Sequence, residues 1–231
     1  MITKFKKFEF RMSDQEIHVI CKEHFIRNYI INPDGSISVD GDVILINRSL
    51  KKIPLVFKEV SGYFYCYRNN LTSLEGCPEK IGGDFDCYRN NLASLEGCPE
   101  KVGGSFFCYQ NNLASLEGCP EKVGGNFFCG FNQLTSLKGC PDARNIYCNN
   151  NQITSFEEIP EFWEGELNIF SNPVDEIFKL FNRDIRCIDL INEFDVIQGN
   201  NKVSRDRLEE VFSQLNMEIP KNIKLINYKL I

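Results

Sequence analysis

Apolar and polar positions recur with a constant 21-residue step through the middle of the chain. Between residues 63 and 141 one phrase is written four times, first as YFYCYRNNLTSLEGCPEKIGG and last as NFFCGFNQLTSLKGCP. Two columns of cysteine keep the same step: Cys66, Cys87, Cys108 and Cys129, and Cys77, Cys98, Cys119 and Cys140. A constant period near 20 is typical of a solenoid, in which each coil buries its apolar residues against neighbouring coils. The sequence therefore predicts a repeat solenoid.

The spacing inside one repeat indicates where each coil has its strand. Phe64, Cys66, Asn69, Leu71 and Leu74 follow the frame LxLxxNxLxxL of a short leucine-rich repeat, with Cys at the second strand position. Because side chains alternate along a strand, we expect Phe64 and Cys66 in the core and their neighbours on the opposite face. The fold class expected is an α/β, leucine-rich-repeat-like solenoid of about 21 residues per coil. One parallel β-sheet would form its concave face.

The same frame continues on both sides of the four clear repeats. A degenerate repeat is expected over about residues 42–62, and two further coils around Ile146 and Leu167. One asparagine per coil falls at the turn after the strand: Asn69, Asn90, Asn111, Asn132, Asn151 and Asn172. Buried amides there would hydrogen-bond the backbone, because buried polar groups need partners. We therefore interpret these asparagines as structural.

The flanking segments are expected to close the ends of the solenoid. Ser13 and Glu16 make a capping box for a helix over residues 13–27, and Ser204 can cap a helix that ends near Leu215. Two strands are also expected in the C-terminal part, at 187–191 and 222–231. The predicted organisation is an N-terminal helix and cap in residues 1–41, about six to seven coils in 42–180, and a C-terminal cap with one helix in 181–231.

Composition narrows the class of partner. The 231 residues carry a net charge of −6 and no block of basic residues, which disfavours double-stranded nucleic acid. The start of the sequence has no apolar run of a secretory signal, and no segment approaches the ~20 apolar residues of a membrane helix. We expect a soluble, cytoplasmic protein that has no membrane partner.

The eleven cysteines are predicted to be core thiols. Their number is odd, they replace apolar residues at strand and turn positions, and their spacing lacks the CxxC or Cys/His clusters of zinc sites. Free cysteine behaves as a small buried hydrophobe. Glycine pairs such as Gly82 and Gly83 also recur with the repeat, and we assign them to its turn geometry. No Ser–His or Cys–His pair, phosphate loop or metal cluster is apparent, so we expect no enzyme activity, metal or cofactor.

The candidate site is the outward side of the strands. Neighbouring strands lie about 4.8 Å apart, so outward side chains of successive repeats form one surface. Its candidate partner-binding residues are Tyr63, Tyr65, Tyr67, Arg68, Tyr88, Arg89, Phe107, Tyr109, Phe128, Phe131 and Tyr147. Even half-exposed, eight aromatic side chains of roughly 150–250 Å² each exceed the largest apolar patch of a typical monomer. The alternative is that these rings only stack on one another along the sheet.

The phrases LTSLEGCPEKIGGDFDC and NPDGSISVDGDVILINRSLKKIP closely resemble a family of cysteine- and glycine-bearing, leucine-rich-repeat-like proteins from tailed bacteriophages, with relatives in bacteria. The likeness covers roughly residues 27–181. It implies the solenoid fold and, for a phage protein, the host cytoplasm, but no activity. Family repeats commonly have small or polar residues where this chain has Tyr67, Tyr88, Phe107, Phe128 and Phe131. This face is therefore interpreted as specialised here.

Three hypotheses follow for the aromatic surface. The first is a non-enzymatic protein-interaction module that holds a host defence or regulatory protein, with the rings as anchors and Arg68 and Arg89 as polar contacts. The second is a binder of a nucleotide signal, in which bases stack on tyrosines and arginines meet phosphate. Net acidity counts against it. The third is a structural protein, such as a virion component, that forms homo-oligomers through this face.

Overall fold

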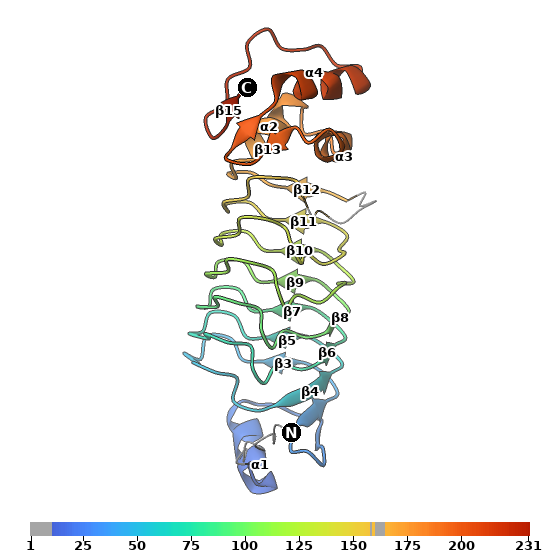
Figure 1. Cartoon of the computed structure of the whole chain (residues 1–231). Helices are drawn as coiled ribbons and strands as arrows, with labels where there is room; N and C mark the ends of the chain where they lie inside the picture. Colours follow the sequence, from blue (N-terminus) through green and yellow to red (C-terminus); the bar gives the residue numbers. More distant parts are fainter. Residues whose placement is uncertain (1–10, 158, 160–164) are drawn as a thin grey trace, which may run out of the picture.

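The computed structural model describes residues 11–157, 159 and 165–231. It is a β-solenoid in which coils of about 21 residues stack one on another (Figure 1). Strands pair in register across each step, Phe64 with Phe85 and Phe85 with Phe106. The repeat solenoid expected from the 21-residue period is confirmed. The described part of the coils consists of strands and turns, and its helices lie at the two ends of the stack.

One face of the solenoid is a parallel sheet of seven two-residue strands. In spatial order they are β12 (Leu167–Asn168), β11 (Ile146–Tyr147), β10 (Phe127–Phe128), β9 (Phe106–Phe107), β7 (Phe85–Asp86), β5 (Phe64–Tyr65) and β3 (Val43–Ile44). The degenerate first repeat and the two repeats after the clear ones each supply a strand. Their predicted frame is therefore confirmed.

A second sheet corrects the expectation of one parallel sheet. Its order is β1 (Tyr29–Ile31), β2 (Ile37–Val39), β4 (Phe57–Val60), β6 (Lys80–Ile81) and β8 (Lys101–Val102), and only the β1–β2 pair is antiparallel. The reason lies in the segments KIGG and KVGG of the repeat. Their aliphatic residues are buried at 21-residue intervals, which brings neighbouring backbones into pairing distance.

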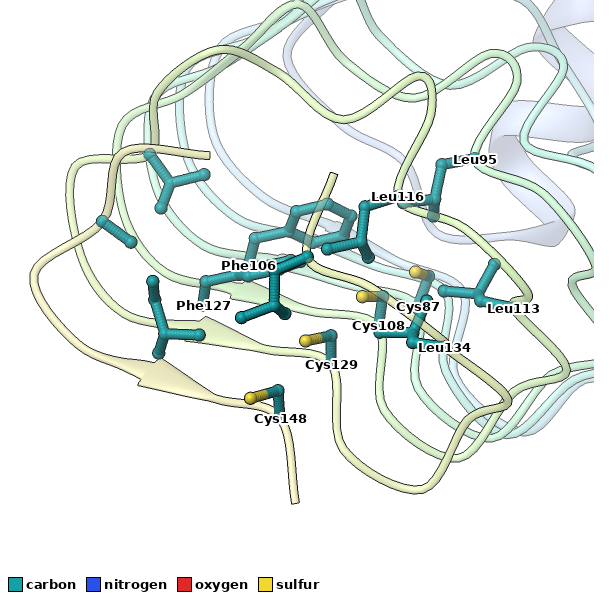
Figure 2. Close-up of a cluster of buried hydrophobic side chains, with 14 of the residues drawn as sticks. Cys87, Leu95, Phe106, Cys108, Leu113, Leu116, Phe127, Cys129, Leu134 and Cys148 are labelled. Atoms are coloured by element: carbon teal, nitrogen blue, oxygen red, sulfur yellow. The ribbon is translucent and has the colours of Figure 1, made fainter. Parts of the chain in front are cut away.

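Cysteine, phenylalanine and leucine side chains form much of the core of the coils. Cys66, Cys87, Cys108, Cys129 and Cys148 are fully buried, and Figure 2 shows the last four along the stack beside Phe106 and Phe127. All the cysteines are free thiols. The prediction of core thiols is confirmed for this column, whereas Cys98, Cys119 and Cys140 are only half-buried. A small polarisable side chain packs a tightly repeated interior without a cavity.

Glycine pairs serve close packing of the coils, which corrects their assignment to turn geometry. A Cβ atom on Gly103 would lie 2.2 Å from the carbonyl oxygen of Gly82, and one on Gly124 would lie 1.9 Å from that of Gly103. The backbone of one coil thus rests directly on the next, and only glycine leaves room for it.

The turn after each outward strand is made by a residue with a left-handed backbone. These residues have φ between 52° and 58° and are Asn47, Arg68, Arg89, Gln110, Phe131, Asn150 and Ser171. Residues other than glycine adopt this conformation at a cost. The repeat therefore holds arginine or phenylalanine in strained backbone positions at the edge of the candidate site.

The N-terminal cap contains helix α1 (Asp14–Glu23), and its capping box between Ser13 and Glu16 is formed as predicted. The helix ends four residues before the predicted boundary, because His24 leaves helical geometry and Phe25 is left-handed. Its buried residues, Ile17 and Cys21, belong to the hydrophobic core. Residues 1–10 fall outside the described part of the chain.

The C-terminal cap has more helix than the one expected. It contains α2 (Asp175–Leu180), α3 (Arg186–Glu193), β13 (Ile197–Gln198), β14 (Lys202–Val203), α4 (Arg205–Gln214) and β15 (Lys229–Leu230). The strand predicted at 187–191 is wrong, because Cys187, Ile188 and Ile191 are buried on one face of α3. The helix after Ser204 and a closing strand near the end are present. Within the described ranges, no helix is long and apolar enough to cross a membrane.

Candidate functional site

The outer face of the seven-stranded sheet carries two columns of side chains. The central column contains Tyr65, Asp86, Phe107, Phe128, Tyr147 and Asn168, and the second column contains Tyr67, Tyr88, Tyr109, Gly130, Asn149 and Phe170. With Tyr63 and the strand-ending residues Arg68, Arg89, Gln110 and Phe131, they form the surface called the aromatic face below. All eleven residues predicted for the site lie on it.

A run of stacked tyrosines follows the second column. The ring centroids of Tyr67 and Tyr88 are 4.6 Å apart, as are those of Tyr88 and Tyr109, with interplanar angles of 24° and 5°. This distance is close to the strand separation of a sheet, about 4.8 Å, so each ring stands on its own strand. Neighbouring rings cover one another's faces. The three side chains are therefore half-buried, and only the uncovered part of each ring reaches solvent.

A second run of rings lies in the central column. Phe107, Phe128 and Tyr147 are stacked with centroids 4.6 Å apart and interplanar angles of 6° at both steps. The Tyr147 hydroxyl donates a hydrogen bond of 3.1 Å to Glu166 Oε2. The two runs overlap only at the coil that holds both Phe107 and Tyr109. The predicted alternative, stacking of rings along the sheet, therefore describes their mutual arrangement correctly.

Two arginines border the tyrosine run. The guanidinium carbon of Arg68 lies 5.8 Å from the ring centroid of Tyr88, and that of Arg89 lies 5.9 Å from it. Arg89 Nε also donates a hydrogen bond of 2.7 Å to Gln110 Oε1. Cations at such distances interact favourably with the face of an aromatic ring. Both side chains thus add positive charge beside Tyr88.

Asp86 interrupts the central column between Tyr65 and Phe107. Its Oδ1 accepts a hydrogen bond of 3.1 Å from the Tyr88 N–H. Burial among the rings raises the pKa of Asp86 to about 7; the Tyr88 N–H bond lowers it, and nearby Asp84 raises it to a smaller extent. The aromatic face therefore contains one carboxyl group whose charge changes near neutral pH.

Gly130 interrupts the second column and leaves a hollow of about 220 Å³. The hollow is lined by Phe107, Tyr109, Phe128, Gly130, Phe131, Tyr147 and Asn149. Phe131 stands at this hollow with 49% of its surface exposed. The side-chain amide of Asn149 has no hydrogen-bond partner among the described residues. A free amide in an apolar hollow is typical of a binding pocket.

Among the residues of the aromatic face that the sequence analysis left out of the candidate site, Asp86, Gly130 and Asn149 change its chemistry most. Each is a departure from a column that is otherwise aromatic over neighbouring repeats. That departure is the signal by which they can be found. The effect of each departure depends on the side chains beside it on the neighbouring strands, and only the register of the sheet identifies those side chains.

Elsewhere the described residues offer little chemistry. Cys187, part of a Cys-x-Asp sequence, is fully buried in α3, and burial raises the pKa of its thiol well above the ordinary range. A buried thiol of this kind is a poor nucleophile. Throughout the described ranges there is no group of three or more His, Cys, Asp or Glu side chains that could hold a metal ion.

Comparison with models of known protein families, with curated proteins and with solved structures gives no match for this chain in any of the three.

Proposed function

We propose that this protein is a non-enzymatic interaction module that holds a partner protein on the aromatic face. The observation that carries the proposal is a surface of nine Tyr and Phe side chains on five neighbouring coils: Tyr63, Tyr65, Tyr67, Tyr88, Phe107, Tyr109, Phe128, Phe131 and Tyr147. Apolar surfaces of this extent mark interaction sites. Tyrosine and arginine, both present here, are the residues enriched at binding hot spots.

Rigidity of the rings supports the same function. Tyr67, Tyr88 and Tyr109 already hold one another in a stack, as do Phe107 and Phe128. A side chain that is fixed before binding loses little conformational freedom when a partner covers it. The stacks thus present a preorganised surface, in addition to the stability that they give to the sheet.

The partner proposed is a protein of a host bacterium, such as a defence or regulatory protein. This part rests on the resemblance of the repeats to those of phage proteins, which also supports the leucine-rich-repeat-like class and a cytoplasmic location. The net charge of −6 supports a protein partner over double-stranded nucleic acid.

A nucleotide is less well supported as the ligand of this face. The hollow of about 220 Å³ is smaller than the roughly 300–1,000 Å³ of most small-molecule sites. Arg89 is engaged with Gln110, and both arginines lie beside Tyr88 rather than at the hollow. Self-association through the face is the other alternative, and a mass measurement over a range of concentrations tests it.

The experiment compares capture of partners from bacterial lysate by three immobilised proteins. They are the natural chain, a face variant with Tyr67, Tyr88, Phe107 and Tyr109 changed to Ser, and a control variant with Lys80, Lys101 and Lys122 changed to Ser. The control residues lie in and beside the other sheet and are exposed. All three must unfold cooperatively on heating.

A protein captured by the natural chain and the control but lost with the face variant is the expected result. A captured protein that the face variant retains contradicts the proposal, as does a failure to capture any protein from lysates of susceptible hosts. A mass that doubles with concentration, and does so only when the face is intact, replaces the proposal with self-association.

A further inference from the structure

The tyrosine run of the second column ends at Tyr109, and the next strand leaves an empty step, a position in the column without a side chain. Tyr67 and Tyr88 each have a ring on the next strand at 4.6 Å, but the strand after Tyr109 carries Gly130. The next side chain in the column is Asn149, two strand steps or roughly 10 Å from Tyr109. One face of the Tyr109 ring is therefore left without the stacking partner that the other tyrosines have.

The space over Gly130, where the tyrosine column has no ring, is bordered by aromatic side chains. Phe107 and Phe128 of the central column stand beside it, and Phe131 stands at the hollow with a left-handed backbone, φ 53°. A bulky residue in this conformation is held there by its surroundings. Five aromatic side chains, those of Phe107, Tyr109, Phe128, Phe131 and Tyr147, thus surround a space of about 220 Å³, smaller than a drug-sized pocket.

The polar groups of the hollow favour a ring that carries a hydrogen-bonding group. The Asn149 amide, unpartnered within the described residues, reaches over Gly130 from the side opposite Tyr109, and its Oδ1 lies 2.8 Å from where a Cβ of residue 130 would stand. A tyrosine hydroxyl or an indole N–H can hydrogen-bond this amide.

We propose that the hollow at Gly130 binds one tyrosine or tryptophan side chain of the partner protein, which occupies the missing step between Tyr109 and Asn149. The inference rests on the proposed function, because it assigns an anchor to the same face. Aromatic anchors that fill a pocket near the middle of an interface carry much of the binding energy in protein complexes. Occupation extends the tyrosine stack from three rings to four.

The test titrates 4-ethylphenol and 3-methylindole, the side-chain analogues of tyrosine and tryptophan, into the isotope-labelled protein. Backbone amide signals of Gly130 and Asn149 are expected to shift and saturate with a dissociation constant in the range of about 1–10 mM, as for ligands of this size. Tyr109→Ser and Phe131→Asn are each expected to weaken binding at least fivefold. Phe170→Ser is the matched control, since Phe170 is 47% exposed against 49% for Phe131 and lies outside the hollow.

Gly130→Tyr fills the step with the protein's own ring and should abolish binding of both analogues. A Cβ atom there would lie 2.8 Å from Asn149 Oδ1, so the amide must move. If this variant does not fold, Tyr109→Ser and Phe131→Asn decide the question. Equal binding by these variants and the natural chain overturns the inference, and so does the absence of saturation at 20 mM or a tighter complex with adenosine monophosphate.

The two proposals fail separately. A lysate partner that is lost with the four-serine face variant but retained by Phe131→Asn and Gly130→Tyr supports the interaction module and overturns the anchor site. Binding of 4-ethylphenol at the hollow, with no lysate partner, overturns the interaction module and the assignment of a partner's side chain to the hollow.

Discussion

The side-chain amide of Asn90 joins its own coil to the preceding one by donating a hydrogen bond of 3.1 Å to the carbonyl oxygen of Cys66. The same nitrogen donates to Cys87 O at 3.0 Å, and Asn90 Oδ1 accepts from Leu71 N at 3.0 Å. One side chain thus satisfies three backbone groups in two coils. The repeat places such an asparagine in every coil of the stack from the second onward.

Asn90→Ala is expected to lower the free energy of unfolding by about 2–4 kcal/mol. The change leaves the buried Leu71 N–H without its partner, which costs about 1–3 kcal/mol, and it removes one of the two amide donors from each of the carbonyl oxygens of Cys66 and Cys87. Asn91→Ala is the control, because Asn91 is exposed. Urea unfolding measures both. Equal stabilities of the two variants would contradict a structural role for the asparagine ladder.

Gly103→Ala is expected to destabilise the solenoid by at least about 3 kcal/mol or to prevent folding. The added Cβ would lie 2.2 Å from the Gly82 carbonyl oxygen, and backbone of a neighbouring coil cannot move without breaking sheet pairing. Gly199→Ala, where no atom lies within 4 Å of the added carbon, should change stability by less than about 0.5 kcal/mol. Thermal unfolding of both variants makes the comparison.

Asp86 should make stability depend on pH between about 4 and 7. Its folded-state pKa of about 7 lies above the ordinary value, near 3.9, so the folded protein keeps a proton that the unfolded chain has lost. The free energy of unfolding therefore falls as the pH rises through this window, and the penalty is complete above about pH 7. Asp86→Asn keeps the acceptor for the Tyr88 N–H and removes the charge.

We expect Asp86→Asn to raise the free energy of unfolding at pH 8 by roughly 1–2 kcal/mol and to leave it nearly unchanged at pH 4, the partial exposure of the carboxyl limiting the gain. Urea unfolding across this range, with the exposed Glu75→Gln as the single-charge control, measures the effect. A pH profile that Asp86→Asn does not alter would show that the carboxyl titrates normally.

Ser171→Gly is expected to stabilise the protein by about 0.5–1 kcal/mol, although glycine usually weakens a chain. Ser171 is exposed and has φ 58°, a conformation that costs an L-residue about 1 kcal/mol and glycine nothing. Arg144→Gly, at an exposed position outside the left-handed set, should instead destabilise by a similar amount. The melting temperature of each variant is compared with that of the natural chain, and the two changes should have opposite signs.

Thiol labelling should separate the two cysteine columns. Cys108 is fully buried and burial raises its pKa strongly, so iodoacetamide should modify it only after unfolding. Cys140 is half-buried, with a pKa raised to about 12, and should react slowly in the folded protein. Mass spectrometry of timed digests follows each site. Modification of Cys108 as fast as Cys140 would contradict the buried column.

Local signals were enough to predict most of the seven-stranded sheet. The alternation of Phe64, Tyr65 and Cys66 marks one buried and one exposed face, and the 21-residue step sets each strand beside its equivalent. The eleven candidate residues follow from that register. The segment around Cys187 was misassigned, because a short apolar run fits a strand as well as a buried helix face.

The sequence by itself determined the coil length, the buried column of Phe and Cys, and the asparagine ladder, because these depend on periodicity and on side-chain chemistry that is the same in every repeat. Tertiary structure decided the second sheet, the contact between glycine pairs, the charge behaviour of Asp86 and the hollow at Gly130. These depend on distances between coils and on the burial that neighbours impose. Such quantities arise only when residues 21 apart lie side by side.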